Sequence, residues 1–481
     1  MKIHSVKFNF IMNFILTVSS IIFPMITFPY ISRVLLPEGN GKIAFVNSVA
    51  TYFTMFASLG IPTYGIRVCA GIRDNKEKLS KTVQELLIIN AVTMSITCAI
   101  FLVSILVIPE FNEEKRLFII YMIGMIVSMF SMNWLYSALE QYSYITACNL
   151  IVKIIFLGLV FLLIKKQEDY ILYGGITMLA NISAYLINFI YAQKFITFKR
   201  NGKYEFKKHL KPIFVFFAMS AAINVYTNLD VIMLRFMKGN TEVGYYNTAI
   251  KVKTILVTLV TSLGAVLLPR LSYYVKKDRK ENFYQTIAKA FNFVMILGLS
   301  LMIYFVIFAE DTVLLLSGGA YRASIPSMMI MMPTVFFIGL SNITGIQVLT
   351  PQNEEKRVLY SILWGAGVDL ILNLVLIPKY ASFGAAFATV IAELVVLIVQ
   401  CIYLKGMFKF ILKEVDFFKI AAAVLLACLA GILVKIYFDA SVFLRLVISA
   451  CIFFGVYGVA LLVMREKFVC ETLKSLLRAK K

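Results

Sequence analysis

Charged residues are scarce in this chain of 481 residues, at 15%, whereas a soluble globular protein carries about 25%. Only two histidines are present, His4 and His209, and both fall in predicted loops. This scarcity excludes a histidine metal cluster and argues against histidine acid–base catalysis. The seven cysteines are odd in number, scattered, and form no CxxC pair, which indicates buried apolar thiols instead of disulfides or zinc ligands.

Apolar residues make up 60% of the chain, and the mean hydropathy is +0.84. They form long runs, which we predict as helices because a peptide group in lipid finds no partner outside its own segment. The first run, 8–31, is too long for a signal peptide and is predicted as an uncleaved span. We place fourteen spans near 8–32, 42–66, 82–108, 116–138, 143–164, 169–193, 212–236, 244–269, 284–308, 324–350, 357–378, 383–404, 417–437 and 442–464.

The net charge is +21, and the cations are concentrated in alternate loops. The positive-inside rule explains this distribution, so we expect no nucleic-acid partner and place both termini in the cytoplasm. The opposite loops are poorer in cations and hold Glu110, Glu113, Glu114, Glu310 and Asp311. The basic loops and tail contain Arg73, Lys76, Lys78, Lys194, Lys199, Arg200, Lys203, Lys207, Lys208, Lys211, Lys276, Lys277, Arg279, Lys280, Lys405, Lys409, Lys413, Arg478, Lys480 and Lys481.

The first half of the sequence pattern recurs after 202 to 204 residues. Ser58-Leu59-Gly60 matches Ser262-Leu263-Gly264, and Gly41 matches Gly244. The spans therefore form two six-helix lobes, related by a pseudo-two-fold axis along the membrane normal, in an all-α polytopic membrane protein. We assign residues 1–193 to the first lobe, 194–211 to a basic cytoplasmic linker, 212–404 to the second lobe, 405–464 to two further spans, and 465–481 to a basic tail. The tail has the pattern of an interfacial helix or of a frayed end.

Several spans carry polar residues at helical spacing, so that each polar set shares one face. Hydrogen bonds between helices are one explanation for these stripes, and a hydrated cavity between the lobes is the other. The stripes are Asn13, Thr17, Ser20 and Thr27 in the first span, Asn47, Thr51, Thr54 and Ser58 in the second, and Asn247, Lys251, Thr254, Thr258 and Ser262 in the eighth.

Charged residues inside the spans need a partner, water or a function, because a charge at the bilayer centre costs about 2.5–3.5 kcal/mol. Snorkelling of arginines and structural ion pairs are the alternatives to a functional site. The cations are Arg33, Arg67, Lys153, Arg235, Lys251, Lys253 and Arg270. The second group comprises Asp369 and Asn373 on one span and Thr389 and Glu393 on the next, which Asp230 could face. Such oxygen-rich groups can hold Na⁺ or carry a proton.

Two motifs resemble those of Wzx-type polysaccharide flippases, of the multidrug/oligosaccharidyl-lipid/polysaccharide exporter superfamily. The first is FPYISRVL at 28–35, followed by PEG at 37–39 and by Gly41, with Leu36 where the family usually has glycine. The second comprises Trp134, Glu140, Tyr144-Ile145-Thr146, Asn149-Leu150-Ile151 and Lys153. The resemblance extends over essentially the whole chain in length, span number and repeat.

The resemblance implies a bacterial plasma-membrane flippase that moves polyprenyl-diphosphate-linked oligosaccharide from the cytoplasmic to the outer leaflet by alternating access. The seven cations and Asn47 would bind the diphosphate and sugars, since arginine grips phosphate in bidentate fashion. The last two spans would guide the polyprenyl tail. Family residues that hold Na⁺ match Asp230, Asp369, Asn373 and Thr389, and Na⁺ or H⁺ is the expected coupling ion. We expect a monomer, with anionic lipids and polysaccharide polymerase or export machinery as partners, and no cofactor or metal.

Two other functions compete with this interpretation. A multidrug exporter of the same superfamily would need a cavity rich in carboxylates, whereas these spans carry an excess of cations. A membrane glycosyltransferase or polymerase would expose a sizeable loop with acids or a nucleotide site. The outward loops here are short, and the sequence has no DxD, GxGxxG or P-loop motif, so we predict a protein that is not an enzyme.

Overall fold

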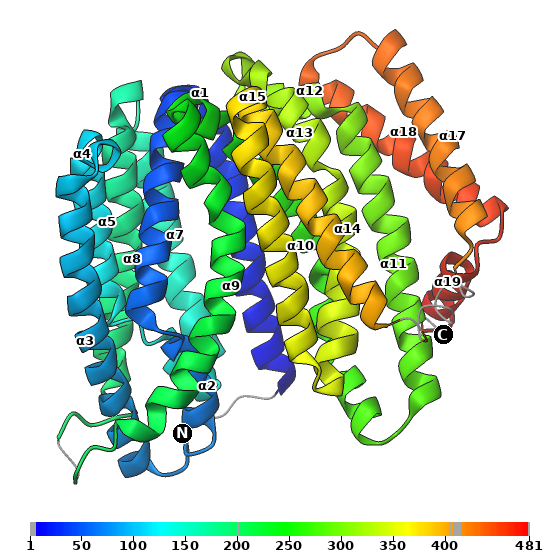
Figure 1. The fold of residues 1–481 in the computed structure, drawn as a ribbon. Helices are drawn as coiled ribbons and strands as arrows, with labels where there is room; N and C mark the ends of the chain where they lie inside the picture. The colour runs from blue at the N-terminus through cyan, green and yellow to red at the C-terminus, as the bar shows by residue number, and fades with distance from the viewer. Residues whose placement is uncertain (1–5, 200–201, 405, 407–414, 480–481) are drawn as a thin grey trace. The chain divides into compact units, whose positions relative to one another are not determined.

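The computed structural model describes residues 6–199, 202–404, 406 and 415–479, and every regular element among them is helical. Residues 1–5, 200–201, 405, 407–414 and 480–481 lie outside the described residues, and with them the predicted loop residues His4, Arg200, Lys405, Lys409, Lys413, Lys480 and Lys481. The chain forms two compact units, Met1–Gly244 and Tyr245–Lys481 (Figure 1). The lobes predicted at 1–193 and 212–404 remain a prediction.

The first unit is built of α1 (Val6–Ser58), α2 (Ile61–Ala70), α3 (Lys76–Val107), α4 (Pro109–Glu113), α5 (Lys115–Ser128), α6 (Asn133–Ala138), α7 (Tyr142–Leu163), a 3₁₀ turn (Gln167–Asp169), α8 (Tyr170–Ala192) and α9 (Lys207–Lys238). The next helix, α10 (Asn240–Lys276), begins at the end of this unit and continues into the second.

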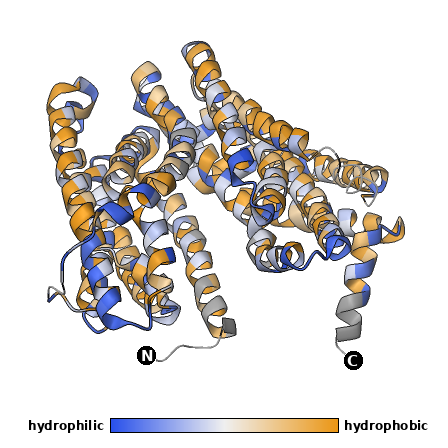
Figure 2. Cartoon of the chain, turned by 60° about the horizontal axis from the view of Figure 1, so that its bottom comes forward, coloured by the Kyte–Doolittle hydropathy of each residue, from blue (hydrophilic) through white to orange (hydrophobic). Residues whose placement is uncertain are grey.

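The second unit continues with α11 (Lys280–Ile307), α12 (Ala309–Ser317), a 3₁₀ turn (Gly319–Ser324), α13 (Ile325–Met331), α14 (Pro333–Ser341), a π-helix (Asn342–Leu349), a 3₁₀ turn (Thr350–Gln352), α15 (Glu355–Tyr403), α17 (Phe417–Tyr437), α18 (Val442–Val463) and α19 (Lys467–Ala479). Figure 2 shows apolar residues along the long helices and hydrophilic residues gathered at their ends, as expected of a membrane protein.

Two of the long helices are hairpins in which the chain reverses. In α15 the amide of Gln400 donates to the hydroxyl of Ser361 over 3.0 Å, although 39 residues separate them, and the backbone is non-helical at Ala381. In α1 the break is at Leu36, whose φ of 57° lies in the region that favours glycine. The glycine that the family usually has at this position would relieve that strain.

Eleven helices in the described part of the chain are long and apolar enough to cross a membrane, or up to twelve if the bent α9 counts as one span. Both α1 and α15 combine two predicted spans, so the observed helices are compatible with fourteen spans. The polytopic all-helical fold is therefore confirmed, while the number fourteen remains a prediction.

Prolines divide two of the predicted spans. The span predicted at 42–66 is wrong as one helix, because α1 ends at Ser58 and α2 begins at Ile61 with Pro62 in its first turn. The span predicted at 324–350 is likewise a series of short helices, with Pro326 and Pro333 each at a helix start. Proline favours the first turn of a helix, since its missing N–H would have no partner there in any case.

The turns at the two ends of the first unit differ in charge. At one end, Lys42 of α1 pairs with the buried Glu114 (3.1 Å), whose carboxylate also accepts from Tyr170 (2.9 Å). At the other end, Arg73 pairs with Glu140, and the basic segment that follows α8 is bound to α3. The end with the basic segment is the one predicted to be cytoplasmic.

The outer turn of α1 and the start of α10 meet backbone to backbone in a symmetric pair of contacts. A Cβ atom on Gly41 would lie 1.8 Å from the carbonyl oxygen of Asn240, and one on Gly244 would lie 2.0 Å from that of Pro37. The two glycines are related by the 203-residue repeat, and so are Pro37 and Asn240. Glycine is therefore required at both positions for this close approach.

Candidate functional site

Lys153 is the most unusual of the predicted site residues. It is half-buried in the middle of α7, where its ammonium donates to the hydroxyls of Ser20 (2.9 Å) and Ser19 (3.2 Å) on α1. The ammonium also lies over the ring of Phe23, 5.8 Å from its centroid. No carboxylate of the described residues pairs with it, so the structural ion pair considered from the sequence is not formed.

The polar stripes hydrogen-bond within their own helices. Thr51 donates to the carbonyl of Asn47 (2.7 Å), Thr254 to that of Ile250 (2.8 Å), and Thr258 to that of Thr254 (2.8 Å). Threonine commonly bonds to the carbonyl four residues back in this way. Because these hydroxyls keep acceptor lone pairs, the stripes remain able to bind a polar ligand.

The other predicted substrate residues of the first unit are placed differently. Arg33 is exposed and donates to the carbonyl of Pro29 in its own helix (2.7 Å). Arg235 pairs with Glu113 and lies over the ring of Phe45, 5.7 Å away. Arg67 and Asn47 are exposed on α2 and on the second half of α1. The structure thus gives Arg235 an acidic partner, and the substrate roles of these residues remain predictions.

In the second unit, α10 carries three predicted cations. Lys251 is exposed and Lys253 is half-buried, and no carboxylate of the described residues pairs with either. Arg270 is exposed and donates through Nε to the hydroxyl of Tyr274 over 2.7 Å. Lys251 and Lys253 therefore share with Lys153 the property of being intramembrane cations outside the observed ion pairs.

The predicted ion-coupling residues of the second unit are all buried. Asp369 and Asn373 lie on the first half of α15, and Thr389 and Glu393 on its second half, each no more than 7% exposed. The reversal at Ala381 brings the two halves into one hairpin, which a joint site of these four residues requires. Asp230 is buried on α9 in the first unit, and its proximity to the α15 residues remains a prediction.

The structure adds polar partners that sequence reasoning missed. The hydroxyl of Tyr246, 1% exposed on α10, bonds that of Thr389 over 2.9 Å. The carboxamide oxygen of Gln400 accepts from Thr344 over 2.5 Å. Tyrosine and threonine in an apolar run have no distinctive spacing, so no signal in the sequence marks these contacts.

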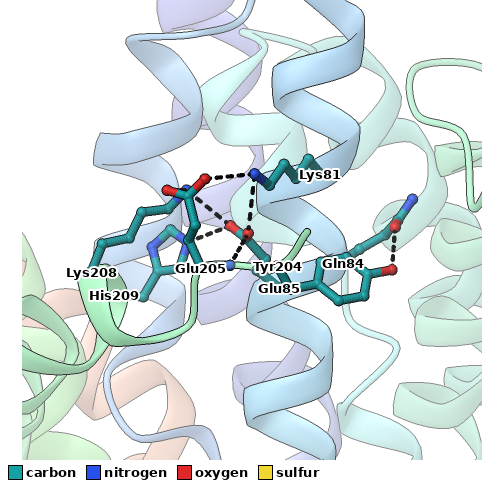
Figure 3. Close-up of polar contacts among 7 residues, drawn as sticks. All are labelled: Lys81, Gln84, Glu85, Tyr204, Glu205, Lys208 and His209. Atoms are coloured by element: carbon teal, nitrogen blue, oxygen red, sulfur yellow. Dashed lines mark hydrogen bonds and ion pairs between the residues drawn. The ribbon is translucent and has the colours of Figure 1, made fainter. Parts of the chain in front are cut away.

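A second polar network fixes the segment between α8 and α9 on the first turns of α3 (Figure 3). Glu85 is completely buried and accepts from the backbone N–H of Glu205 (2.7 Å) and from Nε2 of His209 (2.8 Å). The other ring nitrogen of His209 bonds the hydroxyl of Tyr64 (2.8 Å). The loop position predicted for His209 is therefore wrong, since it is 1% exposed in the first turn of α9.

Neighbouring contacts extend this network along the segment. The amide of Gln84 donates to the carbonyls of Thr197 (2.6 Å) and Lys199 (3.1 Å). Nearby ammonium groups hold the pKa of Glu205 below its usual value. The main cause is the hydrogen bond that Lys81 donates from Nζ to Oε1 of Glu205 over 2.8 Å. Most of the basic segment is thus an ordered part of the first unit.

Replacement of Glu85 by glutamine is expected to destabilise the first unit by about 2–4 kcal/mol, since it breaks a buried charged network. The readouts are thermal unfolding in detergent and protease cleavage within 197–209. Arg73→Gln is the matched control, because its pair with Glu140 is partly exposed and screened by solvent. Equal melting temperatures for both variants would contradict the structural role of Glu85.

The long apolar helices define this chain as a multi-pass membrane protein. Lys153, Lys251 and Lys253 lie inside such helices, and no carboxylate of the described residues pairs with them. The sequence model of the polysaccharide biosynthesis protein family matches residues 6–275. The chain therefore belongs to that family, and the predicted resemblance to Wzx-type flippases is confirmed.

Similar proteins agree with this assignment. The chain is 24% identical over 414 residues to the "Putative O-antigen transporter" of Escherichia coli K12. The aligned region covers 84% of this chain and 97% of that relative. A protein of the same description from Shigella dysenteriae is 25% identical over 400 residues, 82% of this chain and 98% of its own. Among solved structures, lipid II flippase MurJ in an inward closed conformation matches with a TM-score of 0.76 and 15% identity, over 94% of this chain and 99% of that one. This structural likeness supports the fold.

Proposed function

We propose that the protein is a flippase for polyprenyl-diphosphate-linked oligosaccharides, which it moves from the cytoplasmic to the outer leaflet for surface polysaccharide assembly. The observation that carries this proposal is the set of three intramembrane lysines, Lys153, Lys251 and Lys253, for which the described residues provide no carboxylate partner. Each ammonium is costly inside a membrane unless a ligand compensates it, and a diphosphate is such a ligand.

The chemistry of the surrounding residues fits this substrate. The hydroxyls of the stripes on α1 and α10 retain lone pairs for sugar hydroxyls, and Ser19 and Ser20 orient the ammonium of Lys153. The names of the relatives, transporters of O-antigen, support the same substrate class. In our proposal, two lobes rock by alternating access and expose the cations to each leaflet in turn.

A reconstituted assay tests this function directly. Proteoliposomes that contain a labelled undecaprenyl-diphosphate oligosaccharide in the inner leaflet are expected to show protein-dependent exposure of the sugar to an external glycosidase. The same vesicles loaded with cationic dyes test the multidrug alternative. Dye export without movement of the lipid-linked sugar would replace our proposal with the exporter.

We further propose that Asp369, Asn373, Thr389 and Glu393 of the second unit couple transport to Na⁺ or H⁺, and that Asp230 of the first unit also takes part in ion coupling. All five side chains are buried, and oxygen ligands on a rigid hairpin suit Na⁺, whereas a desolvated carboxylate suits a proton. The bond between Tyr246 and Thr389 would transmit occupancy of this site to α10, which carries Lys251 and Lys253.

Asp369→Asn is expected to abolish the dependence of transport on a Na⁺ or proton gradient in proteoliposomes. The amide cannot take up a proton and lacks the charge that attracts Na⁺. The matched control is Asp439→Asn, an exposed acid between α17 and α18. An unchanged ion response in Asp369→Asn, with the protein normally folded, would indicate uncoupled transport.

The proposed setting is the bacterial plasma membrane, with both termini in the cytoplasm. The charge asymmetry of the first unit supports this orientation, because its basic end would face the anionic inner leaflet. We propose a monomer that acts beside polysaccharide polymerase or export machinery.

A further inference from the structure

An open cavity of about 450 Å³ lies in the second unit between α11 and α19, away from all the residues assigned above. Small-molecule sites are commonly about 300–1,000 Å³. Figure 1 shows α19 beside the end of α11 at which that helix begins. The cavity is lined by Glu281, Gln285, Ala288, Lys289 and Asn292 from α11 and by Lys467, Phe468 and Glu471 from α19.

The α11 side of the cavity is a polar stripe inside a candidate membrane span. Glu281, Gln285, Lys289 and Asn292 follow one another at helical spacing and extend about 16 Å along the helix axis. A polar face on a spanning helix needs hydrated or polar neighbours. The stripe therefore indicates a place where polar groups of lipids or water enter between α11 and α19.

The other wall of the cavity is anchored. The buried Glu466 caps the start of α19, accepting from the backbone N–H groups of Phe468 (3.1 Å) and Val469 (2.7 Å). Asp416 accepts from the N–H of Lys467 (3.3 Å) and from the ammonium of Lys419 (2.7 Å). The tail is therefore a capped helix and not a frayed end over Lys467–Ala479, which gives the cavity a defined second wall, while its interfacial position remains a prediction.

The cavity is lined by equal numbers of positively and negatively charged side chains. Two ammonium groups, of Lys289 and Lys467, and two carboxylates, of Glu281 and Glu471, line it. Lys289 of α11 and Glu471 of α19 are 4.0 Å apart, with side chains 65% and 52% exposed, so this ammonium and this carboxylate remain accessible to a ligand. A ligand that complements this lining carries one negative and one positive group.

We propose that this cavity binds the phosphate–ammonium headgroup of a zwitterionic phospholipid, specifically phosphatidylethanolamine. The phosphate would contact the lysines, and the primary ammonium would donate to the carboxylates. A quaternary ammonium has no N–H to donate and is recognised by aromatic cages, whereas Phe468 is the single aromatic residue among the described residues that line the cavity. A purely anionic headgroup would meet the two carboxylates.

Exposed apolar side chains precede the cavity in the chain. Leu462 and Val463, at the end of α18 just before the cavity-lining residues of α19, are 40% and 76% exposed. Such side chains suit the acyl chains of a bound phospholipid.

Native mass spectrometry of the full-length protein tests the proposal, using phosphatidylethanolamine, phosphatidylcholine and phosphatidylglycerol with matched acyl chains. We expect phosphatidylethanolamine to be retained about tenfold more than the other two. Lys289→Ala and Glu471→Ala are each expected to remove this preference. Lys280→Ala and Asp278→Ala are matched controls, because these charged residues are exposed near the start of α11 but do not line the cavity.

Three outcomes would overturn the proposal: equal retention of the three lipids, preferential retention of phosphatidylglycerol, or an unchanged preference in both cavity variants. Hydrogen exchange of α19 separates loss of binding from undocking of the helix, since Glu466 and Asp416 should keep α19 in place in both variants. Soluble O-phosphoethanolamine is the second arm. Its competition with the lipid supports recognition of the headgroup, and binding of it without any retention of the lipid contradicts a lipid site.

Discussion

Lys153→Met is expected to reduce transport of the lipid-linked oligosaccharide at least about tenfold, since a hydrogen bond to a charged group contributes about 1.5–3 kcal/mol. The ammonium of Lys153 is held by Ser19 and Ser20 and pairs with no carboxylate of the described chain, so its charge is available for the substrate. The measurement is flipping in proteoliposomes, together with surface polysaccharide in cells that depend on this protein.

The same variant is expected to leave thermal stability unchanged or to increase it. Removing a cation that no carboxylate of the described residues neutralises from a spanning helix removes an insertion cost of about 2.5–3.5 kcal/mol. Lys153→Arg keeps the charge and is expected to retain part of the activity, whereas Lys166→Met removes an exposed lysine beyond the end of α7 and serves as the control. Full activity of Lys153→Met would remove this residue from the substrate site, and a large loss of stability would indicate a structural role.

Alanine at Gly41 or Gly244 is expected to force the outer turns of α1 and α10 apart. The added Cβ would lie 1.8 or 2.0 Å from a backbone carbonyl oxygen, whereas real Cβ atoms essentially never approach other atoms within 3.0 Å. Overpacking of this kind costs about 1–3 kcal/mol, which would depopulate the conformation in which the turns touch by about 5- to 150-fold. If transport needs this conformation, its rate falls accordingly.

Spin labels at Glu38 and Thr241, which are exposed and related by the repeat, report the separation of the two turns. We expect a longer distance distribution in Gly41→Ala and in Gly244→Ala than in the parent. The control is Gly158→Ala on α7, where a Cβ meets nothing within 4 Å. Unaltered spin-label distances and unaltered transport in both variants would show that the turns do not need to touch.

The sequence predicted the helical class well, because long apolar runs leave few alternatives in lipid. It was less accurate where a helix breaks. Pro62, Pro326 and Pro333 indicated that their spans would not be regular helices. A proline can kink a helix, end it or begin it, however, and the packing of the neighbouring turns decides which. Leu36 gave no local signal of positive φ, and only its departure from the family pattern marked it.

The candidate site was predictable only in part. Intramembrane charges such as Lys153 and Asp369 stand out against apolar neighbours, so spacing alone found them. Their partners did not stand out, because Tyr246 and Ser361 are ordinary residues of an apolar helix until the chain folds. His209 was assigned to a loop because its buried partners, Glu85 and Tyr64, are more than 120 residues away along the chain.

The break between α1 and α2 shows how a duplicated sequence can lose its stereochemical equivalence. Ser-Leu-Gly occurs in both repeats, yet Gly60 has a left-handed φ of 73° between two helices, whereas Gly264 lies within the continuous α10. Beyond these points, the side chains of the two copies no longer project at corresponding angles. Arg67 and Arg270, matched by position in the repeat, are therefore held in different local settings, so each needs its own experiment.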